Sequence, residues 1–283
     1  MPSVTLLGQS LVAGVLAGGL YGLLAFGLTL SWGMLRLVNI GYFALAFLGG
    51  YLTYDLGTLH ELPAWLSAAI IIPIFFVLGV VFHWAFARFR IEGLTSLLVT
   101  FCVIVILESV IQWIWTADFR RYESGYGSDS FRVGVLFIPT LDLLAWLTSV
   151  ALALATWAWL HWTFIGKALR AAAEDEQIAA AYGIDHRRLS YLLAGVCSSF
   201  SAVAGVFIAL TSNLSPSQIW AWFGVVFAVV IIGRLGNPLG ALCAGVLIGV
   251  TESLTMAVAT PAWAPLVSFS VLIGLLLWQP KWL

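Results

Sequence analysis

Two carboxylic acids lie inside long apolar runs of this chain, where an ionisable group is unusual. Glu108 falls within VIVILESVIQW and Glu252 within LIGVTESLTM. At the centre of a bilayer an acidic side chain costs about 2.5 to 3.5 kcal/mol on insertion scales, so it is expected to face a water-filled cavity or a hydrogen-bonding partner. Both glutamates lie toward one end of their runs, which lowers that cost. They are candidates for a solute pathway or a gate, and structural hydrogen bonding within or between subunits is the alternative.

The other reactive residue types show no pattern of a catalytic or metal centre. The 4 histidines are scattered, and the 3 cysteines lie in apolar runs without CxxC spacing. No serine or cysteine has a base at motif spacing, and no GxxxxGK[ST] run is present to bind ATP. We therefore expect no enzyme activity, no metal and no cofactor. The net charge of -1 argues against a nucleic-acid partner.

Charge is concentrated in one segment, Gly166 to Leu189, which holds 8 of the 25 Asp, Glu, Lys and Arg residues. Its alanines favour helix, and an i, i+4 pair between Arg170 and Glu174 would add a few tenths of a kcal/mol. Gly183, followed by an apolar residue, has the pattern of a Schellman C-cap, and Asp185 is suited to cap the next helix. The segment is thus predicted to form two short structured elements in water, open to a partner.

These residues need a membrane-embedded scaffold. With 9% charged and 62% hydrophobic residues, the 283-residue chain has too few polar groups to cover a water-soluble surface. Its pattern does not fit an outer-membrane barrel, so we expect an all-α polytopic membrane protein. Apolar runs predict a bundle of eight to nine transmembrane or re-entrant helices. They lie at about 8–33, 38–57, 63–87, 94–116, 138–163, 190–213, 217–233, 238–258 and 262–279. If any of these helices is re-entrant or broken rather than spanning, we expect it to be the run 38–57 or the run 217–233.

The basic residues indicate the orientation of the bundle. Alternating connections place nine Lys and Arg residues on one side and three on the other. The nine are Arg36, Arg88, Arg90, Lys167, Arg170, Arg187, Arg188, Arg234 and Lys281, and the three are Arg120, Arg121 and Arg132. By the positive-inside rule the N-terminus is outside, residues 164–189 are cytoplasmic between the fifth and sixth long spans, and residues 117–137 form an extracytoplasmic loop. No Lys or Arg precedes the first run, so it is expected to remain as a span rather than be cleaved.

The run GKALRAAAEDEQIAAAYGID, within residues 166–185, resembles the cytoplasmic coupling segment of permease subunits of branched-chain amino acid type ABC importers, the LivH-like family. Three further stretches are similar to that family: Gly18 to Asn39, Thr100 to Ser109 and Ile232 to Glu252. The resemblance covers nearly the whole chain. It implies a single transmembrane permease domain over residues 1–283.

What the resemblance implies is a pore subunit in a bacterial inner (plasma) membrane. Its expected partners are two cytoplasmic ABC ATPase subunits, a second related permease subunit, an extracytoplasmic solute-binding protein and membrane lipid. The solute is expected to be small and polar, a branched-chain or other amino acid, with urea or amides as alternatives within the same type of importer. The positions that match the coupling motif are Gly166, Lys167, Arg170, Glu174, Asp175, Ala179, Gly183 and Ile184.

The chain departs from the family pattern at two places. Where relatives tend to have N-F-A-H-G-E, this chain has Asn39-Ile-Gly-Tyr42-Phe-Ala44, so the His and the Glu are missing. Asn39 is expected to satisfy backbone groups freed at this break rather than to contact solute, although both it and Tyr42 are pathway candidates. Arg234 stands where a glycine pair is expected. Both departures fall at Gly-rich interruptions, which are pointers to a transporter core or simply to close helix packing.

Two other classes of function remain open from the sequence. One is an autonomous secondary transporter driven by an ion bound near Glu108 or Glu252. The other is a non-transporting structural membrane subunit. The charged segment favours a chain that takes its energy from a partner.

Overall fold

The computed structural model of the protein describes residues 4–91, 93–122, 130–133, 136–260 and 263–278. Over these ranges the chain forms eleven helices and one β-hairpin. In chain order they are α1 (Val4–Leu35), α2 (Gly41–Leu59), α3 (Ala64–Phe89), α4 (Gly93–Trp115), β1 (Ser130–Val133), β2 (Leu136–Pro139), α5 (Thr140–Trp162), α6 (Phe164–Glu174), α7 (Glu176–Ala181), α8 (His186–Thr211), α9 (Gln218–Gly233), α10 (Pro238–Val258) and α11 (Ala264–Trp278).

The helices confirm an all-α polytopic membrane protein. Six of those described, α1, α3, α4, α5, α8 and α10, are long and apolar enough to cross a bilayer. The two runs singled out as re-entrant or broken correspond to α2 and α9. Neither is among the six, and α9 has only 16 residues. α2 packs against α8 and α4, which explains why so many of its side chains are buried.

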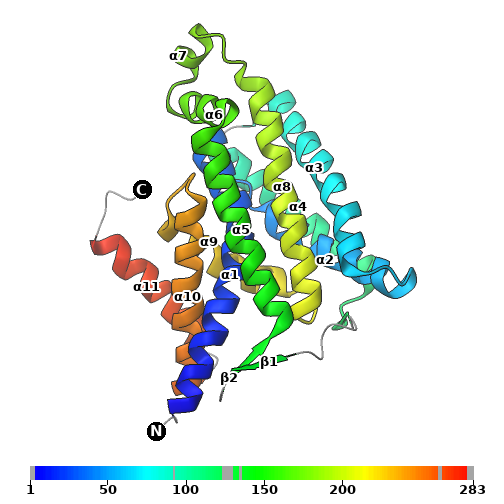
Figure 1. Ribbon diagram of the computed structural model, residues 1–283. Coiled ribbons are helices and arrows are strands. Elements are labelled where there is room, and N and C mark those ends of the chain that lie inside the picture. Colours follow the sequence, from blue (N-terminus) through cyan, green and yellow to red (C-terminus); the bar gives the residue numbers. More distant parts are fainter. Residues whose placement is uncertain (1–3, 92, 123–129, 134–135, 261–262, 279–283) are drawn as a thin grey trace.

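The two sets of connections predicted to lie on opposite sides of the membrane lie at opposite ends of the bundle. Figure 1 shows α6 and α7 at one end, and the N-terminus and the β1–β2 hairpin at the other. The hairpin pairs Ser130 with Pro139 and Val133 with Leu136. It overlaps the C-terminal part of the loop predicted over 117–137. Lys281, counted with the α6–α7 side, falls outside the described residues. We call these two ends of the bundle the α6–α7 end and the N-terminal end.

Helix α1 is the axis of the bundle and makes its most extensive contact with α10. Glycines on both helices let the two backbones touch. A Cβ added at Gly18 would lie closer than 3.0 Å to the backbone of Gly245 and Val246, and one at Gly14 equally close to Gly249. In lipid, where apolar burial does not drive helices together, such close backbone packing is a main source of association.

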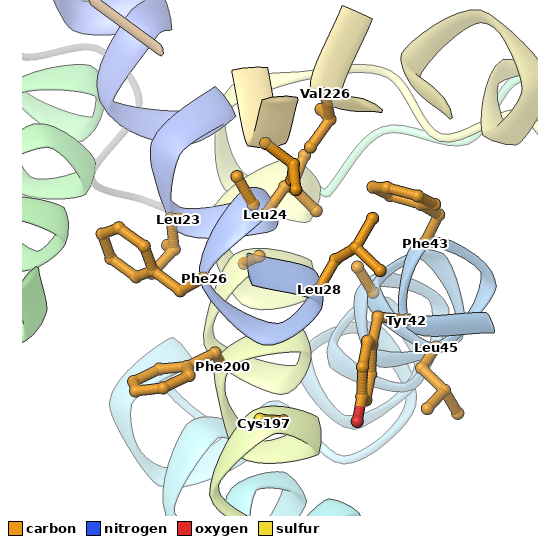
Figure 2. Close-up of a cluster of buried hydrophobic side chains, with 14 of the residues drawn as sticks. Leu23, Leu24, Phe26, Leu28, Tyr42, Phe43, Leu45, Cys197, Phe200 and Val226 are labelled. Carbon is orange, nitrogen blue, oxygen red and sulfur yellow. The ribbon is translucent and has the colours of Figure 1, made fainter. Parts of the chain in front are cut away.

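A cluster of large side chains from α1, α2, α8 and α9 forms the core beside this contact. Figure 2 shows part of it, with Phe26 of α1, Phe43 of α2, Phe200 of α8 and Val226 of α9 converging. Phe26 and Phe200 meet edge to face with ring centroids 5.8 Å apart. Phe43 of α2 and Phe223 of α9 also meet edge to face, 5.6 Å apart, so aromatic packing joins the two short helices.

Two interruptions of helix meet at the last turns of α1. The first is residues 36–40, which run from the end of α1 into the buried start of α2. The second is residues 234–237, where the Gly236 N–H donates to the carbonyl of Thr29 at 2.9 Å. Gly236 has φ +77°, and a Cβ on Gly33 would clash with its backbone, so glycine is required at both positions. The Gly-rich interruptions predicted from the sequence thus come together in space, with close packing as the immediate reason for their glycines.

Candidate functional site

The charged segment forms two capped helices that stand at one end of the bundle. Thr163 begins α6, and its hydroxyl accepts the N–H of Gly166 at 3.1 Å. A Cβ at Gly166 would strike the backbone of Trp159 and Leu160, so glycine allows the sharp turn out of α5. The expected pair between Arg170 and Glu174 is not formed. Instead Arg170 Nε donates to the carbonyl of Leu160 at 3.1 Å, which fastens α6 to the end of α5.

Helix α7 is closed at both ends by local hydrogen bonds. The carboxylate of Asp175 accepts the N–H groups of Gln177 at 2.9 Å and Ile178 at 3.0 Å, a full N-cap. At the other end Gly183, with φ +80°, donates to Ala180 while Ile184 donates to Ala179 at 3.2 Å. These are the two bonds of a Schellman motif, as predicted.

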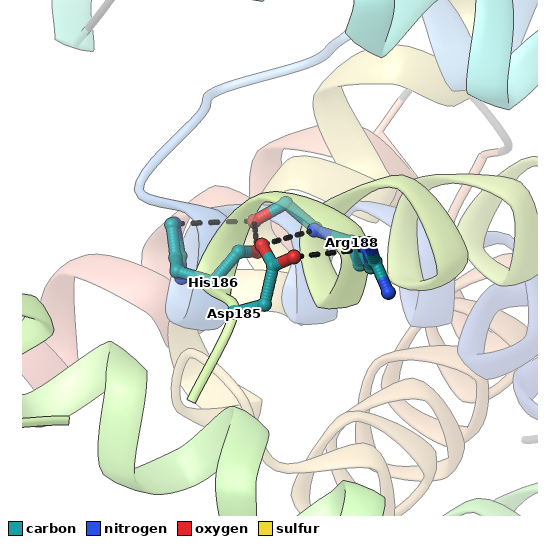
Figure 3. A network of polar contacts seen from close by, with 4 residues as sticks. Asp185, His186 and Arg188 are labelled. Carbon is teal, nitrogen blue, oxygen red and sulfur yellow. Dashed lines mark hydrogen bonds and ion pairs between the residues drawn. The ribbon is translucent and has the colours of Figure 1, made fainter. Parts of the chain in front are cut away.

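The next helix, α8, begins with the predicted cap. Asp185 Oδ1 accepts the N–H of Arg188 at 3.2 Å, and its Oδ2 forms an ion pair with the Arg188 side chain at 2.9 Å. Figure 3 shows this network beside His186. Caps and hydrogen bonds thus hold both helices in a fixed connection between α5 and α8.

A further tether reaches α1. The guanidinium of Arg36 donates to the carbonyls of Ala173 at 3.1 Å and Glu174 at 3.4 Å, at the C-terminal end of α6. A cation at the end of a helix also satisfies carbonyls that lack a partner within it. The exposed helix pair is thereby connected to the interruption that follows α1.

Two exposed apolar residues at the tip of α7 were not predicted from the sequence. Ile178 of α7 and Tyr182, which follows it by four residues, are 60% and 85% exposed. They lie on one face of the tip, in a segment predicted to be in water, where exposed apolar side chains at helical spacing mark a contact surface. The signal was their i, i+4 spacing, which the many alanines and charges around them obscured. We call Ile178 and Tyr182 the α7 tip pair.

The buried interruption at residues 36–40 is held by hydroxyl groups of α4. Ser96 Oγ accepts the N–H of Val38 at 3.0 Å, and Thr100 Oγ1 accepts that of Ile40 at 3.3 Å and donates to the carbonyl of Val38 at 3.2 Å. Backbone that leaves a helix inside a membrane protein is tolerated only where such partners replace the lost bonds. Ser96 and Thr100 are four residues apart, so both face the interruption.

Asn39 and Tyr42 lie at this interruption. The Asn39 Oδ1 accepts the N–H of Gly41 at 3.0 Å, the backbone-capping role expected for it. Tyr42 is only 2% exposed and lies among apolar side chains beside Cys197 (Figure 2). Both line a cavity of about 10 Å³, large enough for about one water molecule. In this conformation neither residue reaches an open passage, so their contact with solute stays a prediction.

Replacing Thr100 by valine is expected to destabilise the protein by about 1 to 2 kcal/mol, because it keeps the shape of the side chain while leaving the Ile40 N–H and Val38 carbonyl short of a partner. Thermal unfolding in detergent measures the loss. Ser109→Ala is the matched control, since the Ser109 hydroxyl bonds only within α4, to Val105. Equal stability of the two variants would contradict the role assigned to Thr100.

The two intramembrane glutamates have separate hydrogen-bond partners. Glu108 accepts the indole N–H of Trp220 at 2.7 Å. Glu252, 5% exposed, accepts the hydroxyls of Tyr21 at 2.8 Å and Ser268 at 2.6 Å, and so joins α1, α10 and α11. The structure does not bring the two carboxylates together. Each is satisfied in the way expected of a structural acid in a membrane.

A cavity of about 260 Å³ opens near Glu252 toward the N-terminal end. It is lined by Tyr21 and Trp222, whose rings meet edge to face at 5.6 Å, and by Gln9 and Asp142 nearer the mouth. The Tyr21 hydroxyl thus connects the cavity wall to Glu252.

Substituting leucine for Glu252 is expected to lower stability by about 1 to 3 kcal/mol, because the buried hydroxyls of Tyr21 and Ser268 lose their acceptor. Glu252→Gln keeps one acceptor oxygen and is expected to fall between leucine and the wild type. Thermal unfolding in detergent measures the order of stability of the wild type and the two variants. A leucine variant that melts like the wild type but no longer transports would instead place Glu252 in the pathway.

These features define a class of protein: a multi-pass membrane protein with a capped helix pair presented at one end. Residues 10–276 match the family described as branched-chain amino acid transport system, permease component. The chain belongs to this family, whose members are membrane permease components of ABC transport systems and are not themselves enzymes.

Curated relatives span almost the full length of the chain. The high-affinity branched-chain amino acid transport system permease protein LivH of Escherichia coli (strain K12) is 23% identical over 96% of this chain and 93% of its own. BraD, the corresponding permease protein of Pseudomonas aeruginosa, is 22% identical over 99% and 96%. The probable branched-chain amino acid transport permease protein LivH of Methanocaldococcus jannaschii is 26% identical over 88% and 81%. No solved structure matches the chain.

Proposed function

We propose that this chain is a pore-forming subunit of an ABC importer for small polar solutes, with branched-chain amino acids as the first class to test. The observation that carries the proposal is the α6–α7 pair, capped at both ends, tethered to α1 and α5, and ending in the exposed α7 tip pair. A rigid element of this kind suits transmission of force from a partner that hydrolyses ATP.

The partners proposed are two cytoplasmic ATPase subunits, a second related permease subunit and an extracytoplasmic solute-binding protein. The residues proposed for ATPase coupling are the eight that match the motif, together with the α7 tip pair. Among the motif residues, Asp175 and Gly183 act by shaping α7, and Arg170 acts by fixing α6 to α5. Lys167 and Glu174 remain available to a partner.

The amino acid assignment is supported by the names of relatives at 22 to 26% identity. Because the stretch from Asn39 to Ala44 departs from the family pattern, other small polar solutes, among them urea and amides, should be tested beside amino acids. Four residues are proposed to shape the solute pathway without binding the solute themselves: Glu108, Glu252, Asn39 and Tyr42.

Uptake of labelled solutes by cells lacking this chain tests the proposal. Deletion is expected to reduce the uptake of at least one branched-chain amino acid. Expression of the wild-type chain together with its proposed partner subunits is expected to restore that uptake. Transport by the purified chain alone, driven by an ion gradient and without ATP, would identify a secondary transporter instead. Unchanged uptake across amino acids, amides and urea would leave only a structural role.

A further inference from the structure

A large basic cavity lies at the α6–α7 end of the bundle, away from the cavity near Glu252. Its volume is about 1010 Å³, and it is bounded by the connection after α1, the end of α3 and the starts of α4 and α8. Four arginines and one glutamate are its charged lining residues: Arg36, Arg88, Arg90, Arg187 and Glu176. Positive charge thus exceeds negative charge in a single concave site.

No carboxylate of the described residues forms an ion pair with the guanidinium groups of this cavity. Among the residues that the structure describes, the one ion pair joins Arg188 to Asp185, and neither lines the cavity. Arg36 bonds to neutral carbonyl groups, and Arg187 lies 5.9 Å from the ring centroid of Tyr191. The remaining two, Arg88 and Arg90, are exposed, and their guanidinium groups make no hydrogen bond or ion pair to another described residue.

A buried polar atom in the same wall also lacks a partner. The Nδ1 of His186 is buried and makes no hydrogen bond within the described part of the chain, while its Nε2 lies 3.1 Å from the Ser190 hydroxyl. The Ser190 hydroxyl donates to the His186 carbonyl at 2.8 Å, so its oxygen can accept the Nε2–H of the ring. The anion-binding character of the cavity therefore rests on its arginines, whose guanidinium groups suit an oxyanion.

The cavity lies where the apolar surface of the bundle ends. Trp84 and Phe89 of α3 are 53% and 73% exposed, and Leu94 of α4 is 80% exposed. These side chains belong to helix faces with many other exposed apolar residues, which lipid must cover. The arginines therefore meet a bilayer at the depth of its head groups.

We propose that this cavity binds the phosphate of an anionic phospholipid from the leaflet at the α6–α7 end. The phosphodiester would lie between Arg88, Arg90 and Arg187, with the acyl chains along the exposed faces of α3 and α4. Basic pockets between helices at the cytoplasmic surface are suited to such head groups. The bound lipid would contact both the interruption after α1 and the start of α8, and so would join the lipid surface to the α6–α7 pair.

The test compares lipid binding by two double variants of the full chain, each lacking two positive charges. The pocket variant is Arg88→Gln with Arg90→Asn, because Arg90 has φ 52° and asparagine tolerates that conformation. The control variant is Arg121→Gln with Lys167→Gln, one at each end, both exposed and outside the cavity. Each is placed in phosphatidylcholine nanodiscs with increasing phosphatidylglycerol, and retained lipid is counted by native mass spectrometry. Glycerol phosphate is added in a parallel series.

The wild type is expected to retain phosphatidylglycerol selectively, and the pocket variant to bind it about thirtyfold more weakly, from two lost arginine contacts. The control variant is expected to stay within about twofold, because charges outside the cavity are distant and screened. All three proteins should melt alike, since none of the four substituted side chains makes a hydrogen bond or ion pair to another described residue.

Three results would overturn the proposal. Equal weakening in both variants would mean general surface attraction. Full competition by glycerol phosphate would mean a site for soluble phosphate rather than lipid. Unchanged lipid binding with loss of ATPase association in the pocket variant would mean that the cavity receives a protein partner.

Discussion

Replacing Ile178 by aspartate and Tyr182 by serine is expected to abolish stable association with the ATPase subunits and to reduce ATP-driven uptake to background. Both side chains are exposed apolar groups on the tip of α7. Truncation of an aromatic or aliphatic residue that fills a partner pocket commonly costs about 2 kcal/mol or more, so the pair should weaken binding by roughly a thousandfold. Co-purification of tagged chain with its partners measures this directly.

The internal structure of the variant should be unaffected, because neither side chain packs into the bundle. Leu59→Asp is the matched control: Leu59 is 72% exposed, but at the end of α2, on the other side of the bundle from α7. It is expected to leave ATPase association intact. If the α7 variant still retained its partners, the contact surface would have to be sought on α6 or elsewhere.

The second large effect is expected from Gly18→Leu. A Cβ at this position would lie closer than 3.0 Å to the backbone of Gly245 and Val246 on α10, where no side chain can rotate away. The two helices would have to separate. Overpacking in a core commonly costs about 1 to 3 kcal/mol, and here it would be at the upper end or beyond, since the whole α1–α10 contact is affected. We expect little folded protein in the membrane fraction.

Gly274→Leu provides the comparison, because a Cβ there meets nothing within 4 Å. This variant should accumulate and melt like the wild type. Detergent extraction followed by size-exclusion chromatography and thermal unfolding distinguishes the two. Normal accumulation of the Gly18 variant would show that the α1–α10 contact can relax.

Structural features that depend only on residues close together in the sequence were predicted correctly. The Gly183 turn and the Asp185 cap depend on residues within one helical turn, and both were found as predicted. The apolar runs likewise indicated the six long spans. The run of α2 was set apart by its lack of a preceding polar linker and that of α9 by its length, whereas α11, whose run was not set apart, has 15 residues and is not among the six. Coupling of the segment to an ATPase stays a prediction.

Features set by tertiary contact were not accessible in the same way. Arg170 was paired with Glu174 by its spacing, but the carbonyl of Leu160 competes successfully because α6 turns back on the end of α5. The i, i+4 spacing of Ser96 and Thr100 is visible in the sequence. Nothing in the sequence indicates that their hydroxyl groups bond to the backbone of residues 36–40. Of the two partners of Glu252, Ser268 lies on the next helix, but Tyr21 is 231 residues away in the sequence.

The pairing of α1 with α10 has a consequence for how the protein is made. α1 is synthesised before α10, which follows roughly 200 residues later. Until then the groove of α1 that includes Gly14 and Gly18 must face lipid or an insertion factor. Assembly of the bundle therefore cannot finish before α10 is made, and a chain arrested before Pro238 would leave α1 without its partner helix.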